Sequence, residues 1–400
     1  MKTKISLVVL IVFNLCLVYG QTFQDVTAAD SEDEINDLCA SLSLGFTSTP
    51  KAISNVIDEI VNTAGLTEGG FELAQCSNIN NVIAKILTDE KGNDVRYIIF
   101  DAEWLQSFSE EGSNDWRGKY ILAHEIGHHL NGHRFDNVSS NQKYELEADY
   151  FAGRALANLG ASLDETLAVL EMLPMKATYS HPGRAERAAQ GEAGWKSIKN
   201  KEYNNRVNAI TKTVKQEDVS EIARENLSEI NELCKSLSLD DTGGYTSTPK
   251  EISKIIDEIV NTAGIANGRF KLAQCSNINN TIAKILIDEE GNEVRYIIYD
   301  AEWLQSFSEE GSNDWRGKYI LAHEIGHHLN GHRFDNVSSN QKYELEADYF
   351  AGRALANLGA SLDETLAVME TLPLKATSSH PGRVERAAQA DAGWKSISKK

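Results

Sequence analysis

The spacing of apolar and polar positions predicts short helices and strands in the first half of the chain. Apolar residues recur at helical spacing from Ile53 to Val61. Thr49-Pro50 supplies a favourable helix start, and Gly65 a stop. A further short helix is predicted at 33–44, and strands are predicted at 71–76, 82–87 and 95–100, the last two as a hairpin around a polar turn.

The stretch that follows the predicted hairpin has the pattern of a group of helices. Leu122, Ile126 and Leu130 form one apolar stripe, which a helix would bury. Ser162 and Glu165 have the spacing of a capping box at a helix start. The predicted helices are 115–131, 144–159, 162–173 and 182–193. The expected fold is therefore α+β, mainly helical with a small antiparallel sheet.

The chain repeats itself in tandem. The segment from Asp101 to Val169 recurs without change from Asp300 to Val368, and weaker similarity extends on both sides. Each copy is long enough to bury a core of its own. We therefore predict two domains, 30–199 and 225–400, joined by a polar segment 200–224 that is either a linker or a solvated helix.

Charge and the N-terminus limit the possible functions. The 400 residues carry a formal net charge of −20, which disfavours binding to nucleic acid or to anionic membrane surfaces. Lys2 and Lys4 precede the apolar run from Ile5 to Val18, and residues 1–20 therefore have the pattern of a cleaved signal peptide. No later stretch is long and apolar enough to span a membrane, so we expect a protein that is secreted or periplasmic.

Four cysteines lie beyond the predicted signal peptide. An even number in an exported chain indicates disulfides, and their spacing does not match that of metal ligands. Four cysteines allow three connectivities, and the repeat favours one bridge within each copy. The favoured pairs are Cys39–Cys76 and Cys234–Cys275.

The strongest chemical motif is His124-Glu125-Ile126-Gly127-His128. On a helix, His124 and His128 project from one face and can bind one metal ion. Glu125 lies about 100° around a helix of 3.6 residues per turn, where it can act as general base on a metal-bound water. This chemistry predicts a hydrolase with one Zn²⁺ in each copy. The second copy repeats these residues as His323, Glu324 and His327.

A catalytic zinc ion usually has a third protein ligand. His133 misses the metzincin spacing by one residue. Glu145 and Asp149 share one face of the next predicted helix, so one carboxylate can bind the metal while the other orients a ligand histidine. We take Glu145 as the ligand, with Glu147 as the alternative. The equivalents of Glu145 and Asp149 in the second copy are Glu344 and Asp348.

His-Glu-x-x-His, then Glu-x-x-x-Asp, then His181-Pro182 with Arg187 resembles the gluzincin peptidases of the HtpX, Oma and CAAX prenyl endopeptidase type. The resemblance implies a zincin-like fold, Glu145 as third zinc ligand and Asp149 as support of a ligand histidine. It also implies that His181 and Arg187 steady the oxyanion, and that strand 82–87 binds substrate at a sheet edge. The corresponding residues of the second copy are His380, Arg386, Glu344 and Asp348.

The prediction is a secreted zinc-dependent metalloendopeptidase acting on proteins or peptides, with Glu125 and Glu324 as general bases. Known members of the resembling family are membrane-embedded, so processing of prenylated proteins is not expected of this chain. One alternative is a narrow-specificity regulatory peptidase that resembles the ImmA type. Another is a non-catalytic metal-binding or adhesion protein, although such a protein would not need the retained glutamates. No ligand or base differs between the copies, so nothing favours a silent copy.

Overall fold

The computed structural model of the chain has a fold of the α+β class. The predicted signal peptide 1–20, the predicted helix 33–44 and the joining segment 200–224 lie outside the described residues. The structure describes residues 46–47, 51–199 and 231–398, except 68, 78, 90–92, 109–115, 135–141, 174, 178–180, 233, 236–244, 247–249, 266–268, 289–291, 308–314, 334–339 and 378–379.

Beyond the predicted helix 33–44, which is outside the described residues, the first copy contains the helices and strands that the apolar pattern predicts. The first long helix ends just before Gly65, whose φ of +85° suits glycine. The capping box of Ser162 and Glu165 is present, although the helix it opens passes into a 3-10 turn. The elements are β1 (Phe46–Thr47), α3 (Lys51–Thr63), β2 (Glu72–Cys76), β3 (Val82–Thr88), β4 (Asp94–Phe100), α4 (Ala102–Gln106), α5 (Trp116–Leu130), α6 (Gln142–Leu159), α7 (Leu163–Leu167), η1 (Ala168–Met172) and α8 (Arg184–Lys199).

The sheet is mixed, so the prediction of an antiparallel sheet was wrong in one pairing. The strand order is β1-β2-β4-β3, and β3 pairs antiparallel with β4 as the hairpin predicted. β2, however, runs parallel to β4, with Leu73 opposite Ile98. The last five residues of β4 are buried, so this strand takes a central place and pairs on both sides. β3 is left as an edge strand beside α5.

Small residues let the helices of each copy pack closely. A methyl group at Gly153 on α6 would lie 1.9 Å from the carbonyl oxygen of Gly191 on α8. A methyl group at Gly194 would similarly meet the carbonyl oxygen of Tyr150, at 2.0 Å. α6 and α8 therefore cross with their backbones almost in contact, and this crossing brings the polar side chains of α8 next to those of α6.

The second copy repeats the element order and the sheet order of the first. Its elements are β5 (Tyr245–Thr246), α11 (Lys250–Thr262), β6 (Lys271–Cys275), β7 (Thr281–Ile287), β8 (Glu293–Tyr299), α12 (Ala301–Gln305), α13 (Trp315–Leu329), α14 (Asn340–Leu358), α15 (Leu362–Leu366), η3 (Ala367–Thr371) and α16 (Arg383–Ser398).

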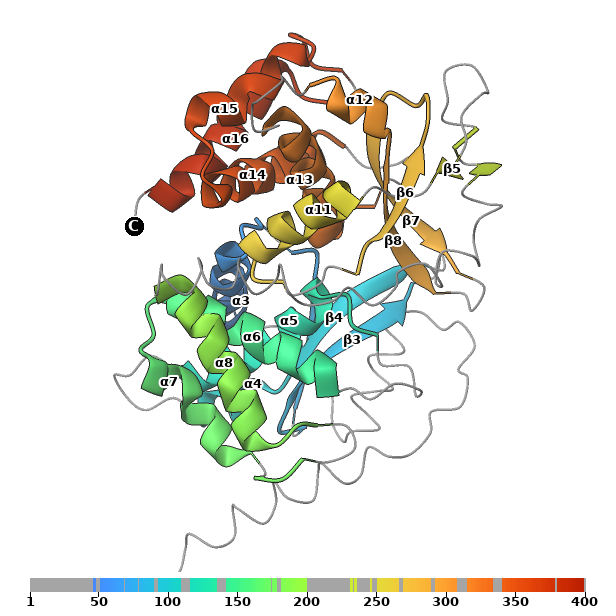
Figure 1. Cartoon of the computed structure of the whole chain (residues 1–400). Coiled ribbons are helices and arrows are strands. Elements are labelled where there is room, and N and C mark those ends of the chain that lie inside the picture. Colours follow the sequence, from blue (N-terminus) through green and yellow to red (C-terminus); the bar gives the residue numbers. More distant parts are fainter. Residues whose placement is uncertain are drawn as a thin grey trace, which may run out of the picture.

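The two copies pack against each other, with α11 and β8 of the second turned toward the first (Figure 1). A single cluster of buried apolar residues includes members from both copies. Arginines cross between them to backbone carbonyls: Arg154 donates to Thr262 O at 2.8 Å, and Arg353 to Thr63 O at 2.9 Å. Arg295 reaches His129 O at the end of α5, at 3.1 Å. The copies are therefore joined by an interface as well as by the chain.

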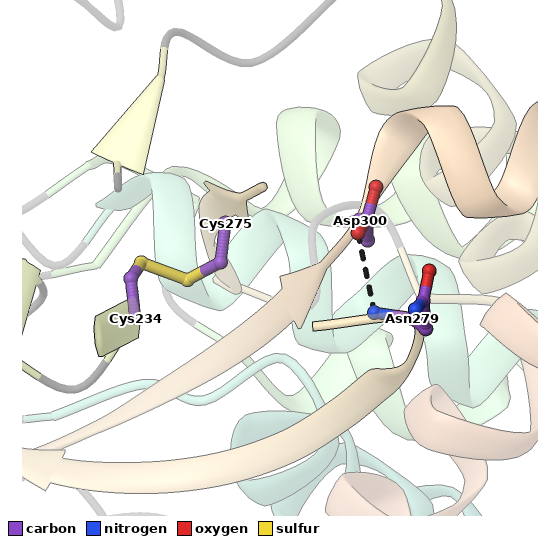
Figure 2. The surroundings of a disulfide bond; sticks show 4 residues. All are labelled: Cys234, Cys275, Asn279 and Asp300. Atoms are coloured by element: carbon purple, nitrogen blue, oxygen red, sulfur yellow. Dashed lines mark hydrogen bonds between the residues drawn. A yellow bond between two sulfur atoms is a disulfide. The ribbon is translucent and has the colours of Figure 1, made fainter. Parts of the chain in front are cut away.

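A disulfide joins Cys234 to Cys275 at the end of β6, as predicted (Figure 2). Close by, Asp300 accepts a hydrogen bond from the backbone N–H of Asn279 at 3.2 Å. In the first copy, Cys76 is also disulfide-bonded, and its predicted partner Cys39 lies outside the described residues. Within the described part of the chain, no helix has both the length and the hydropathy needed to cross a membrane.

Candidate metal centre

The His-Glu-x-x-His motif lies on α5, buried as the apolar stripe predicts. Leu122, Ile126 and Leu130 are fully buried on one side of this helix. The helix ends at a glycine turn, where Gly132 has φ +69°. Gly127, inside the motif, allows close packing against α6, because a methyl group at this position would lie 3.1 Å from Cα of Ala148. The motif can therefore lie close against α6.

That close packing brings three side chains to one point. His124 Nε2 and His128 Nε2 lie 3.0 Å apart. Glu145 on α6 completes the group, with its Oε2 at 3.3 Å from His124 Nε2 and its Oε1 at 3.5 Å from His128 Nε2. The second copy reproduces these three distances at 3.1, 3.2 and 3.5 Å for His323, His327 and Glu344. Each copy thus has a His/Glu group that could hold a metal ion: His124, Glu125 and His128 in the first copy, with Glu145 beside them, and His323, His327 and Glu344 in the second.

Asp149 supports His124 from behind. It is completely buried, and its Oδ1 accepts hydrogen bonds from His124 Nδ1 at 2.9 Å and from the Tyr120 hydroxyl at 3.1 Å. Arg187 on α8 donates to the same carboxylate through Nε at 2.7 Å and Nη2 at 2.9 Å. With its proton on Nδ1, His124 presents the lone pair of Nε2 to the site.

His128 is supported by a second histidine. His133 follows the glycine turn at the end of α5 and returns toward the helix, with its Nδ1 2.8 Å from His128 Nδ1. On its other side, His133 Nε2 lies 2.7 Å from Glu147 Oε2. One proton arrangement gives every nitrogen a single role: His128 Nδ1–H donates to His133, and His133 Nε2–H donates to Glu147. In this arrangement His128 Nε2 carries a lone pair that can bind a metal ion.

The candidate ligands and the candidate base have shifted pKa values. Burial acts to raise the pKa of Glu145, but His124, His128 and Arg187 lower it to about 2. Glu145 is therefore ionised, as a metal ligand must be. Burial raises the pKa of Glu125 to about 7. Its Oε2 accepts a hydrogen bond from the backbone N–H of Ala84 on β3, at 2.7 Å.

The remaining predicted residues border the same group. His181 is half-exposed, with its Nε2 3.8 Å from Glu145 Oε1. Arg187 is buried, and its Nη1 lies 3.4 Å from Glu145 Oε2. The guanidinium thus contacts the candidate ligand and its supporting carboxylate, and its predicted oxyanion role stays a prediction. In the second copy, His380 and Arg386 occupy the same positions relative to Glu344 and Asp348.

Sequence reasoning missed two contributors to this network. Tyr120 lies in the apolar flank that precedes the motif, and nothing in that pattern indicates its hydrogen bond to Asp149. His133 was weighed only as a metal ligand, although its place just past Gly132 marks a chain reversal back toward His128. His129, next to His128, is buried outside this network, and its Nε2 donates to Tyr97 O at 2.8 Å.

Comparison of the chain with protein-family models, with curated proteins and with solved structures found no match.

Proposed function

We propose that each copy is a zinc-dependent endopeptidase, with zinc bound by His124, His128 and Glu145 in the first copy. The observation that carries this proposal is the spacing of the three donor atoms. Tetrahedral Zn–N and Zn–O bonds of about 2.0–2.1 Å place donors about 3.3–3.4 Å apart. The separations here are 3.0, 3.3 and 3.5 Å. The equivalent ligands in the second copy are His323, His327 and Glu344.

The donor set also fits a catalytic centre. Two imidazoles and one carboxylate are a common catalytic zinc set, which leaves a coordination position open. Both imidazoles have an outer hydrogen-bond partner that fixes their tautomer, Asp149 for His124 and His133 for His128. Glu147, the alternative ligand, instead accepts from His133 and lies behind the site. Glu145 is therefore the better choice as third ligand.

Bound zinc would supply Lewis acidity and lower the pKa of water to near 7. Glu125 holds and passes on the proton, because its own pKa of about 7 suits a base near neutral pH. The Ala84 N–H keeps Oε2 of this carboxylate directed across the site. Arg187 holds Asp149 and Glu145 in place, and the half-exposed His181 stands at the rim, where it can reach a substrate. The zincin-like fold is part of the same proposal.

An extended peptide is the proposed substrate. β3 is the edge strand of its sheet, and the N–H of Ala84 points away from β4 toward Glu125. A peptide added along this edge would pass directly beside the base. The acidic charge of −20 supports a protein or peptide substrate over nucleic acid.

We propose that the protein is secreted or periplasmic. The Cys234–Cys275 disulfide supports an oxidising compartment, and so does the bonded state of Cys76.

Hydrolysis of unfolded casein by the zinc-loaded protein tests the proposal. The control is the Glu125→Gln, Glu324→Gln double variant, which should keep its metal and lose about 10²–10⁴-fold in rate. Each single variant should retain about half of the parent rate, since the two sites have the same ligands. Equal hydrolysis by parent and double variant would contradict the assignment of the base. Zinc binding without hydrolysis by either would favour the narrow-specificity peptidase or the non-catalytic binding protein.

A further inference from the structure

The two sites are identical in sequence over their central segment but differ in their surroundings. Arg269 of the second copy reaches across the interface, and its Nη2 lies 3.1 Å from Glu147 Oε2 of the first copy. The guanidinium also lies over the Tyr144 ring, 4.3 Å from its centroid. Tyr144 in turn stacks on His133, with ring centroids 4.3 Å apart. Arg269 therefore touches two of the groups that hold His133.

In the described part of the chain, no arginine of the first copy contacts Glu346 of the second site as Arg269 contacts Glu147. His332 again binds Glu346, at 2.6 Å, and stacks on Tyr343. The residue that corresponds to Arg269 in the repeat is Gly70, which has no side chain to reach Glu346. The difference is built into the interface, because a Cβ at Gly70 would lie 2.3 Å from the carbonyl oxygen of Asn330. An arginine cannot occupy that position without movement of the backbone.

The backbone at Arg269 is also unusual. Its φ is +50°, in the left-handed region that favours glycine, and Gly70 has φ +60° at the same place in the first copy. An arginine here adopts a conformation that glycine would adopt at lower cost. Strain of this kind persists where the surrounding contacts hold it, and it is found most often near functional sites.

We propose that Arg269 is a positioning residue that the second copy contributes to the metal site of the first. This inference rests on the proposed metal-binding function. Arg269 holds Glu147 and Tyr144, these hold His133, and His133 directs His128 Nε2 toward the metal. The chain therefore carries two unequal sites, and the first binds zinc more tightly because its outer support is more complete.

The test measures zinc affinity at one site at a time, by competition with a chromogenic chelator. The His323→Ala, His327→Ala background leaves only the first site, and the His124→Ala, His128→Ala background leaves only the second. Arg269→Gly introduces the residue that the first copy carries at this place, and it suits φ +50°. We expect it to weaken the first site about threefold to tenfold, less than the 10–100-fold typical of a direct outer partner. The second site should not change.

A double-variant comparison separates positioning from a general effect on the interface. Glu147→Gln should weaken the first site about 10–100-fold, and adding Arg269→Gly should then change nothing, because Arg269 acts through Glu147. The visible spectrum of Co²⁺ bound at the first site should shift in Arg269→Gly, while the spectrum at the second site stays the same. Glu346→Gln is the matched control at the second site, because adding Arg269→Gly should leave the zinc affinity of that site unaltered.

The possible results distinguish the inference from the proposed function. Three results would overturn the positioning role while leaving the metal sites in place. They are an unchanged zinc affinity at the first site in Arg269→Gly, effects of Arg269→Gly and Glu147→Gln that add, and equal weakening of both sites. Failure of both sites to bind zinc would overturn the proposed function and this inference together.

Discussion

Replacing Asp149 with asparagine removes one charge from the centre of the ligand network. The carboxylate has no exposed surface, and it receives hydrogen bonds from His124, Tyr120 and Arg187. Asparagine keeps the shape and one acceptor oxygen, but its amide nitrogen would face the donors of Arg187. The buried guanidinium then loses its strongest partner, at 2.7 Å.

The expected magnitude follows from the burial of both partners. Removing one member of a buried ion pair costs about 3–5 kcal/mol, and the retained oxygen places Asp149→Asn near the lower end, about 3 kcal/mol. The loss should be measured by urea unfolding of the metal-free protein. Zinc affinity at the first site should fall about 10–100-fold, because His124 loses the group that fixes its tautomer.

Two variants control this experiment. Asp348→Asn should produce the same loss at the second site, because Arg386 donates to Asp348 at 2.7 and 2.8 Å. Asp164→Asn neutralises an exposed carboxylate and should change the free energy of unfolding by less than about 0.5 kcal/mol. A loss below about 1 kcal/mol for Asp149→Asn, together with unchanged zinc affinity, would refute the reasoning about this network.

Two further predictions concern packing and pH. Gly153→Ala should destabilise the protein by at least about 2–3 kcal/mol, because its methyl group would lie 1.9 Å from the carbonyl oxygen of Gly191. Gly191→Ala should be tolerated, because the second copy carries the buried Ala390 at the equivalent position. Equal unfolding free energies for these two variants would contradict the close helix crossing. Burial lowers the pKa of His129 and His328 to about 3, below the value of about 6.5 in the unfolded chain. Between these two values the unfolded state therefore binds more protons than the folded state. The stability that each histidine contributes is complete above about pH 6.5, and as the pH is lowered it decreases by up to about 1.4 kcal/mol per pH unit. Unfolding of the metal-free His129→Gln, His328→Gln variant should show a flatter pH dependence than the parent, and identical slopes would contradict this account.

The local parts of the site could be predicted from the sequence because they depend on helix geometry. Four-residue spacing places His124 with His128, and likewise Glu145 with Asp149, whatever the rest of the fold does. The structure brings these two faces together as predicted, since Gly127 and Ala148 let α5 and α6 meet closely. The edge position of β3 likewise agrees with the hairpin and with the proposed substrate strand.

The long-range parts could not be predicted in the same way. The parallel pairing of β2 with β4 depends on which strand is buried at the centre, and local patterns do not encode that order. The interface between the copies joins residues far apart in the chain, such as Arg353 and Thr63. Arg269 lies outside the segment that repeats without change, so the repeat does not single it out. Its contact with Glu147 required the tertiary structure.

The most direct test of the central claim is the number of zinc ions on the native chain, measured by native mass spectrometry. We expect two ions on the parent protein and one on the His124→Ala, His128→Ala variant. We expect none when His323→Ala and His327→Ala are added. A parent protein that carries no more zinc than the fourfold variant would contradict the claim that these residues form metal centres.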